Sequence, residues 1–436
     1  MTARLRAIWL AVNASYWFYP ALAALLALLL SAITVHLDHN GASDWLARFG
    51  AIIPARPQGA SNLLTVISGS MIGVASTVFS ITIAAVAYAS GNYGPRLLTN
   101  FMEDRGNQLS LAAFIGTFTY ALFILRTVRA PGEAVAGGGP SQAGFVPQLS
   151  LLVAMGLMGL SIATLVYFLN HIPSSIRINT VLEGIGRRLL DMVDDMFPEP
   201  CRETVGEPPA HFFPVAATGT GYIQVIEWGA LDDAVEDAGR RFSLSLRAGD
   251  FVHPGVELGR LDGPAGDDAL DRIRGAFALG ATRTPAQDLQ FLIDELVEIA
   301  LRALSPGIND PFTAITAIHW LGAATALFGQ RDLNRRIGGE TKDRDAIAPL
   351  NDRFDHYLYR GFGAARGSIA SSKLVTMMTF EALQNAALPL DSAARREAIR
   401  EEGRLLFEQA RLALQGPELD EVRARAEAFD KALAPA

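Results

Sequence analysis

One stretch of the C-terminal half carries most of the side chains whose spacing could support binding chemistry. Asp294, Glu298 and Arg302 recur at every fourth position, so a helix would place them on one face. Asn309 and Asp310 follow shortly after, beyond a Ser-Pro-Gly turn. Carboxylate and amide oxygens are typical ligands of cations, so these residues could bind a cation or a polar ligand.

The same stretch also has a purely structural interpretation. The Ser-Pro-Gly sequence ends the first helix, and Asp310 is placed to cap the next one. Pro311 fits the first helical position, and Glu298 precedes Arg302 in the order that favours an ion pair. We therefore expect a helix–turn–helix corner, because helix-capping acids are far commoner than unpaired carboxylate sites.

Other familiar patterns of catalytic chemistry are missing from the sequence. It contains no glycine-rich phosphate loop, no Gly-x-Ser-x-Gly elbow and no zinc-protease helix. Cys201 is the single cysteine, which excludes an intrachain disulfide and a cysteine-rich metal site. We expect no catalytic residues, no cofactor and no bound metal. Structural or surface roles are predicted for the histidines, which are His36, His39, His171, His211, His253, His319 and His356.

A second feature is the uncharged stretch over residues 57–95, whose small and hydroxylated residues recur every three or four positions and share one helix face. A lipid-facing helix does not need such a face, whereas a helix packed against others, or lining a wet cavity, can use one. We predict that this pore or packing face is buried against protein or a central path. Its residues are Thr65, Gly69, Gly73, Ser76 and Ser80.

The elements that position these two features follow from the distribution of charge. The chain has 436 residues, of which 50% are hydrophobic, and charge is dense only after Arg177. This pattern predicts a membrane domain over residues 1–175 and a soluble region after it. Apolar runs of about 20 residues suit a bilayer crossing. We predict four helical spans, near residues 17–37, 61–90, 108–128 and 149–169.

The arginines in the loops indicate the orientation of the spans. Two groups fall on opposite sides of the membrane, and the larger group predicts that both termini lie in the cytoplasm of a bacterial inner membrane. The first span is expected to be an uncleaved anchor. The larger group is Arg4, Arg6, Arg96, Arg105, Arg177, Arg187 and Arg188, and the smaller is Arg48, Arg56 and Arg129.

The soluble region is predicted to be of mixed α+β class. Residues 176–200 read as an amphipathic connecting helix, and alternating apolar residues predict a small β-barrel or sandwich over 203–262. Residues 266–436 have a helical pattern, interrupted by a charged linker over 329–348. The net charge of -8 gives no indication of nucleic-acid binding.

The motif from Leu304 to Ala314, together with Gly91-Asn-Tyr-Gly-Pro-Arg-Leu-Leu98, resembles the signature of a bacterial domain-of-unknown-function family of predicted membrane proteins. The resemblance implies a multispan N-terminal half and a soluble C-terminal half, and it transfers no activity. Separately, residues 218–225 and 247–258 resemble the barrel-sandwich hybrid of biotinyl and lipoyl domains. That region has no lysine to carry a cofactor, since the lysines are Lys342, Lys373 and Lys431.

Three classes of function remain. The first is a homo-oligomeric channel or transporter in the lipid bilayer, gated by its cytoplasmic domain. The alternative is a membrane-anchored sensor or scaffold that binds a ligand or partner through that domain. An enzyme is the least supported class, because no catalytic constellation appears. The spans carry no charged residue at their centres, which argues against an ion path, although hydroxyls and carbonyls can line a pore.

Overall fold

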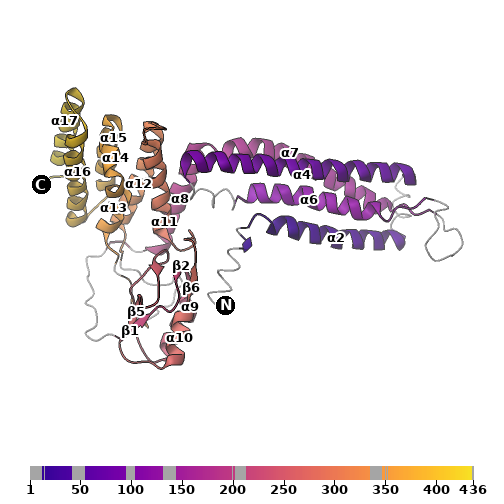
Figure 1. Ribbon diagram of the computed structural model, residues 1–436, viewed down its shortest axis with the longest axis horizontal. Coiled ribbons are helices and arrows are strands. Elements are labelled where there is room, and N and C mark those ends of the chain that lie inside the picture. Colours follow the sequence, from indigo (N-terminus) through magenta and orange to yellow (C-terminus); the bar gives the residue numbers. More distant parts are fainter. Residues whose placement is uncertain are drawn as a thin grey trace. The chain divides into compact units, whose positions relative to one another are not determined.

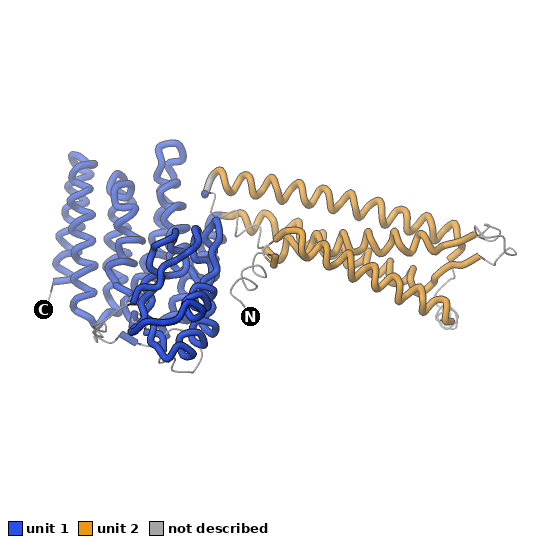
Figure 2. Tube along the Cα trace, turned by 60° about the horizontal axis from the view of Figure 1, so that its bottom comes forward, with its two compact units in different colours: residues 1–11, 92–95, 178–436 blue, residues 12–91, 96–177 orange. Residues whose placement is uncertain are grey.

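The computed structural model describes residues 12–13, 15–41, 55–94, 104–130, 144–198, 200–201, 213–333, 346–348, 350 and 352–434. The chain divides into two compact units (Figure 2). Unit 1 comprises residues 1–11, 92–95 and 178–436, and unit 2 comprises residues 12–91 and 96–177.

Unit 2 is a bundle of long apolar helices that run side by side (Figure 1). The four predicted spans correspond to four of its helices, with differences of up to three residues at the ends of the first and third spans: α2 (Phe18–His39), α4 (Pro57–Tyr93), α6 (Arg105–Leu125) and α7 (Gln148–Ser175). Five helices among the described residues are long and apolar enough to cross a membrane: these four and α12 (Pro311–Gln330). Unlike the others, α12 is mostly buried, and it lies among helices of unit 1.

An apolar core joins the four helices of unit 2. Phe114 and Tyr120 of α6 are fully buried in it, as is Phe168 of α7. The bundle therefore excludes water from its centre by ordinary close packing of side chains. From α4 the core receives Ala60, Leu64, Ile67, Met71, Ala75 and Val78.

Some of the polar groups buried in this bundle form hydrogen bonds between helices. The hydroxyls of Thr117 and Ser161 lie 2.9 Å apart. The carboxylate of Asp38, at the end of α2, accepts hydrogen bonds from the backbone N–H groups of Leu149 and Ser150, both at 3.0 Å. A negative charge there stabilises the N-terminus of α7, so these bonds connect α2 to α7.

At the opposite end of the bundle, Asp104 caps α6. Its Oδ1 accepts hydrogen bonds from the N–H groups of Gly106 at 2.7 Å and Asn107 at 3.2 Å. His171, near the end of α7, places Nε2 2.8 Å from Asp104 Oδ2, and Tyr167 stacks on the imidazole with ring centroids 5.1 Å apart. At each end of the bundle, therefore, an aspartate carboxylate joins α7 to a neighbouring segment.

The longest segment of unit 1, residues 178–436, begins with α8 (Ile178–Met196) and contains two small sheets. The order in the first sheet is β1-β5-β3-β7, and in the second it is β4-β2-β6. All pairs are antiparallel except β3 and β7. The strands are β1 (Phe213–Ala216), β2 (Gly221–Ile226), β3 (Phe242–Leu244), β4 (Phe251–Val252), β5 (Glu257–Leu261), β6 (Phe277–Gly280) and β7 (Ile347–Ala348).

The two sheets share one core with α9 (Trp228–Asp237) and α10 (Asp267–Gly275). Strands β1 to β5 lie within the predicted β region, but β6 and β7 come from the region after residue 266, for which helices and a charged linker were predicted and no strand. A run of four or fewer apolar residues has no readable periodicity, so it cannot be told from helix without its partner strand. The small sheets therefore extend beyond residue 262 in sequence.

The rest of unit 1 is helical, with α12 near its centre and α8, α11 and α15 packed against it. Figure 1 shows the last helices side by side in a layer. The elements are α11 (Leu289–Ala303), α12, α13 (Phe354–Gly361), a 3-10 turn (Gly363–Ala365), α14 (Arg366–Ala370), α15 (Lys373–Ala387), α16 (Ala393–Ala413) and α17 (Pro417–Ala432).

Candidate functional site

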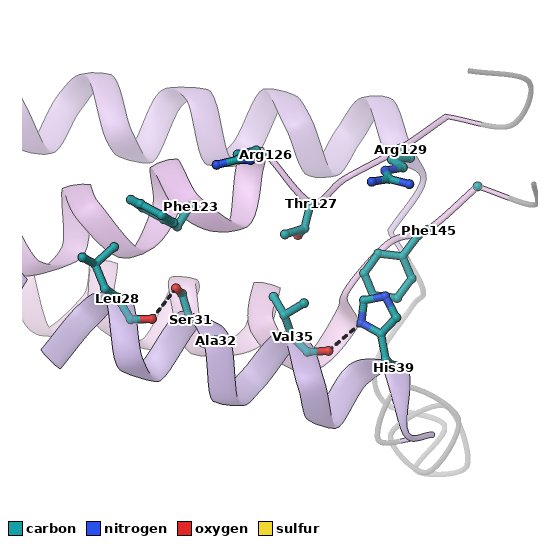
Figure 3. A pocket seen from close by; sticks show the side chains of 11 residues that line it. Leu28, Ser31, Ala32, Val35, His39, Phe123, Arg126, Thr127, Arg129 and Phe145 are labelled. Atoms are coloured by element: carbon teal, nitrogen blue, oxygen red, sulfur yellow. Dashed lines mark hydrogen bonds between the residues drawn. The ribbon is translucent and has the colours of Figure 1, made fainter. Parts of the chain in front are cut away.

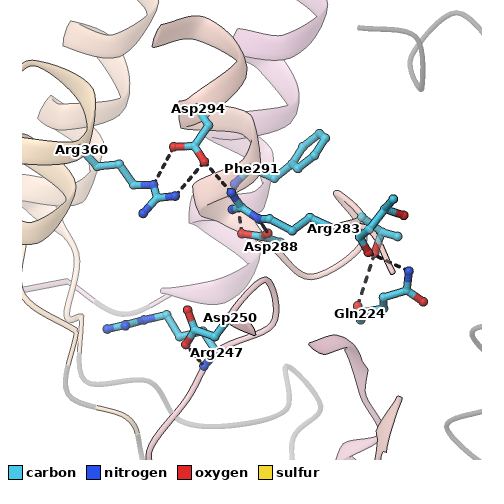
Figure 4. A network of polar contacts seen from close by, with 10 residues as sticks. Gln224, Arg247, Asp250, Arg283, Asp288, Phe291, Asp294 and Arg360 are labelled. Carbon is cyan, nitrogen blue, oxygen red and sulfur yellow. Dashed lines mark hydrogen bonds and ion pairs between the residues drawn. The ribbon is translucent and has the colours of Figure 1, made fainter. Parts of the chain in front are cut away.

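Asp294, predicted as a candidate ligand-binding residue, lies in a network of arginines and aspartates (Figure 4). Arg360 of α13 donates from Nε to Asp294 Oδ1 and from Nη2 to Oδ2, both at 2.7 Å. Arg283 donates from Nη1 to Asp294 Oδ2 at 2.5 Å and from Nε to Asp288 Oδ2 at 2.6 Å. The network ties the segment before α11, α11 itself and α13 together.

The charges of this network balance, with two guanidinium groups facing two carboxylates. Burial lowers the pKa of Arg283, but its bonds to Asp288 and Asp294 outweigh burial and raise that pKa above its ordinary value. Asp288 also caps α11 by accepting from the Phe291 N–H at 3.0 Å. Both Asp294 oxygens already accept hydrogen bonds from arginine, so a cation binding there would compete with the guanidinium groups.

The remaining residues of the motif form the corner between α11 and α12. Glu298 and Arg302 are an i, i+4 pair with 3.7 Å between Oε1 and Nε. Asp310 caps α12, accepting from the N–H of Thr313 at 3.2 Å and from its hydroxyl at 2.6 Å. Asn309 adopts φ +49°, a left-handed conformation that asparagine tolerates. The predicted helix–turn–helix corner is therefore confirmed.

Within the described residues, the hydrogen bonds of Asp294 and Asp310 have no partner in common, since one carboxylate binds arginines and the other binds Thr313. Among the described residues, no three His, Cys, Asp or Glu side chains are placed to hold a metal ion. The corner instead presents apolar side chains outward, with Phe312 71% exposed. The described residues of the motif therefore do not form a preorganised set of metal ligands.

The small-residue face of α4 lies on the outside of the single chain. Gly69 and Gly73 have no atom within 4 Å of the position that a Cβ would occupy. The buried side of α4 includes Leu64 and Ile67, whereas other large apolar residues such as Val66 are exposed like the small-residue face. The predicted burial of the small-residue face therefore requires a second molecule and stays a prediction. All its members are exposed: Thr65, Gly69, Gly73, Ser76 and Ser80.

A cavity of about 810 Å³ in unit 2 was not anticipated from the sequence (Figure 3). It lies between α2 and the end of α6, and Arg126 and Arg129 are among its lining residues. His39 stacks on Phe145 there with ring centroids 4.1 Å apart. Two arginines three residues apart at the end of a span were its sequence signal, but their apolar neighbours belong to a different helix.

Comparison with known proteins defines the class of the chain. Residues 13–385 match the family described as "Predicted membrane protein (DUF2254)", and the chain belongs to this family. The resemblance noted from the Leu304–Ala314 motif is thereby confirmed.

The relatives that match are bacterial. The chain is 36% identical over 302 residues to "Uncharacterized protein Rv1290c" of Mycobacterium tuberculosis, a match that covers 65% of this chain and 56% of that protein. The same figures hold for "Uncharacterized protein Mb1321c" of Mycobacterium bovis. The chain thus spans little more than half the length of these relatives. No solved structure matches the chain.

Proposed function

We propose that the protein is a homo-oligomeric channel or transporter of the bacterial inner membrane, in which the α4 faces of neighbouring copies line a path for a small ion or solute. Unit 1 would lie in the cytoplasm with both termini and gate this path. The supporting observation is the outward position of the small-residue face on α4.

Assembly through this face is favoured for a steric reason. At 100° per residue, the exposed face around Gly69 and Ser76 lies nearly opposite the buried face around Leu64 and Met71. Glycine costs a helix about 1 kcal/mol relative to alanine, which brings no benefit on a lipid-facing surface. Facing another copy, however, glycines let two backbones approach closely. A second copy is therefore the partner that this face suits best.

The hydroxyl groups on this side of α4 favour a second candidate function. Thr65 donates to the Ser61 carbonyl at 2.8 Å, and Ser80 donates to the Ser76 carbonyl at 2.9 Å. These groups are satisfied within their own helix, so the face does not require water. A dry seam between copies would then support a membrane-anchored sensor or scaffold, with unit 1 binding the ligand or partner.

One pair of cysteine variants separates the two candidates. In a Cys201→Ser background, Ser76→Cys places a thiol on the exposed face, and Ser68→Cys places a matched thiol on the buried side of the same helix. If the face lines a path, a small charged thiol reagent modifies Ser76→Cys in intact membranes and changes ion flux in liposomes. Ser68→Cys stays unmodified.

An unreactive Ser76→Cys variant without flux would reject the channel and leave the dry seam. The mass of the purified protein in detergent tests the assembly itself. A monomer would reject both forms of the proposal, because a path or seam between copies needs at least two of them.

A further inference from the structure

The cavity between α2 and α6 combines an apolar wall with two cationic side chains (Figure 3). Leu28, Ala32 and Val35 recur on one face of α2, and Phe123 of α6, 42% exposed, faces them across the cavity. We infer that this cavity binds an anionic phospholipid, with the headgroup phosphate at Arg126 and Arg129 and an acyl chain along the apolar wall.

The apolar wall offers no hydrogen-bond donor that a ligand must satisfy. The Ser31 hydroxyl donates to the Leu28 carbonyl at 2.7 Å, and the Thr127 hydroxyl donates to the Ile124 carbonyl at 2.7 Å. Both hydroxyls in the lining therefore already have acceptors. A hydrocarbon chain matches such a wall, since burying apolar surface is favourable and no polar group is left unpaired.

The two arginines supply the opposite chemistry. Arg126 and Arg129 are exposed, and neither forms an ion pair with an acidic side chain of the described residues. A guanidinium group binds phosphate oxygens in a bidentate manner and suits this role better than lysine. Both residues follow the end of α6, where a spanning helix reaches the level of the lipid headgroups.

The backbone around the cavity holds this end of the bundle in place. The N–H of Arg129 donates to the Phe145 carbonyl at 2.9 Å, and the N–H of Phe145 donates back at 3.1 Å. His39 donates from Nδ1 to the Val35 carbonyl at 2.8 Å, and its ring stacks on Phe145. In that tautomer His39 Nε2 is an acceptor, so it can receive a hydrogen bond from a headgroup hydroxyl.

The size of the cavity also fits a headgroup with the upper part of one chain. Sites for small molecules are commonly about 300–1,000 Å³, and this one measures about 810 Å³. The net positive charge of its described lining favours a headgroup that carries no cation of its own. Phosphatidylglycerol meets this condition, and phosphatidylcholine of the same chain length does not.

Native mass spectrometry of the full-length protein with these two lipids tests the inference. The wild-type protein should bind phosphatidylglycerol about tenfold or more tightly than phosphatidylcholine. Arg126→Gln and Arg129→Gln should each lower the affinity for phosphatidylglycerol about tenfold, the effect expected for one charge-assisted hydrogen bond. Arg105→Gln, at the other end of α6, is the matched control and should leave that affinity unchanged.

Two results would overturn the inference. Equal loss in Arg105→Gln and Arg126→Gln would show general attraction of anionic lipid to the protein surface. Retention of phosphatidylglycerol by Ala32→Phe, which fills the apolar wall but keeps both arginines, would show that no chain enters the cavity. In that second case inorganic phosphate should compete with the lipid, which would identify a simple anion site instead.

Discussion

Arg360 of α13 donates two hydrogen bonds of 2.7 Å to Asp294 of α11, although the residues are 66 positions apart. This bidentate pairing occupies both oxygens of the carboxylate that the sequence indicated as a candidate ligand. It also makes Asp294 a structural residue that several segments of unit 1 depend on, which can be measured.

Removing the Asp294 carboxylate should destabilise unit 1. Asp294→Ala leaves Arg283 and Arg360 without their shared partner in a site where Asp294 is only 14% exposed. Breaking a buried pair costs about 3 kcal/mol, so the melting temperature in detergent should fall clearly. Asp237→Ala breaks an exposed pair with Arg272 and should cost less than about 1 kcal/mol. Equal effects of the two variants would contradict the structural role.

The cap on α12 should make a smaller contribution. Asp310→Ala removes both acceptors for Thr313 and should lower the free energy of unfolding by about 1 kcal/mol. Asp310→Asn keeps a capping oxygen and should lose much less. If instead the melting temperature of Asp310→Ala matched that of the wild type, the capping role assigned to Asp310 would be wrong.

His356 should make the stability of unit 1 depend on pH. Burial lowers the pKa of His356, and the nearby positive charges of Arg247 and Arg360 lower it further, against weaker opposing effects of Asp352 and Asp250. The unfolded chain then binds the proton more readily than the folded one. The stabilising contribution is therefore complete above the ordinary pKa of 6.5 and is lost as the pH falls below it.

Melting curves between pH 5 and pH 8 can check this linkage. His356→Gln should flatten the fall in melting temperature below about pH 6.5, the range where unshifted histidine titrates. His253→Gln changes an exposed histidine of the same unit and serves as the control. Parallel curves for wild type and His356→Gln would show that burial of this imidazole does not affect folding in that range.

The orientation of the spans is tested by labelling. Because the loop arginines predict cytoplasmic termini, single cysteines at Ser43 and Ser141 should react with an impermeant reagent from the periplasm in a Cys201→Ser background. Both positions lie outside the described residues. Labelling at either site only after permeabilisation would show that the predicted orientation is inverted, with unit 1 outside the cytoplasm.

Local patterns in the sequence were enough to predict the helices of unit 2 and the corner at Asp310. A spanning helix is defined by its own apolar length, and a cap involves residues three positions apart, so neither needs distant partners. The two features therefore appear in the structure where the sequence predicted them. The family signature around the corner is likewise a pattern of residues that are close in sequence.

Strand pairing and ion pairing were decided by the tertiary structure. Phe277 of β6 lies opposite Ile226 of β2, and Arg360 reaches Asp294 across 66 positions. The periodicity of one segment does not indicate which distant segment it pairs with, because such a pairing forms only when the folded chain brings both together.

The two faces of α4 show what the sequence determines and what only the tertiary structure decides. The sequence determined that α4 is an apolar helix with one small-residue side, and the tertiary structure decided that Leu64 and Ile67 enter the bundle while Gly69 faces outward. Helical periodicity reports which residues share a side but not what lies against it. In an apolar helix both sides can be buried, so the packing partners alone select between them.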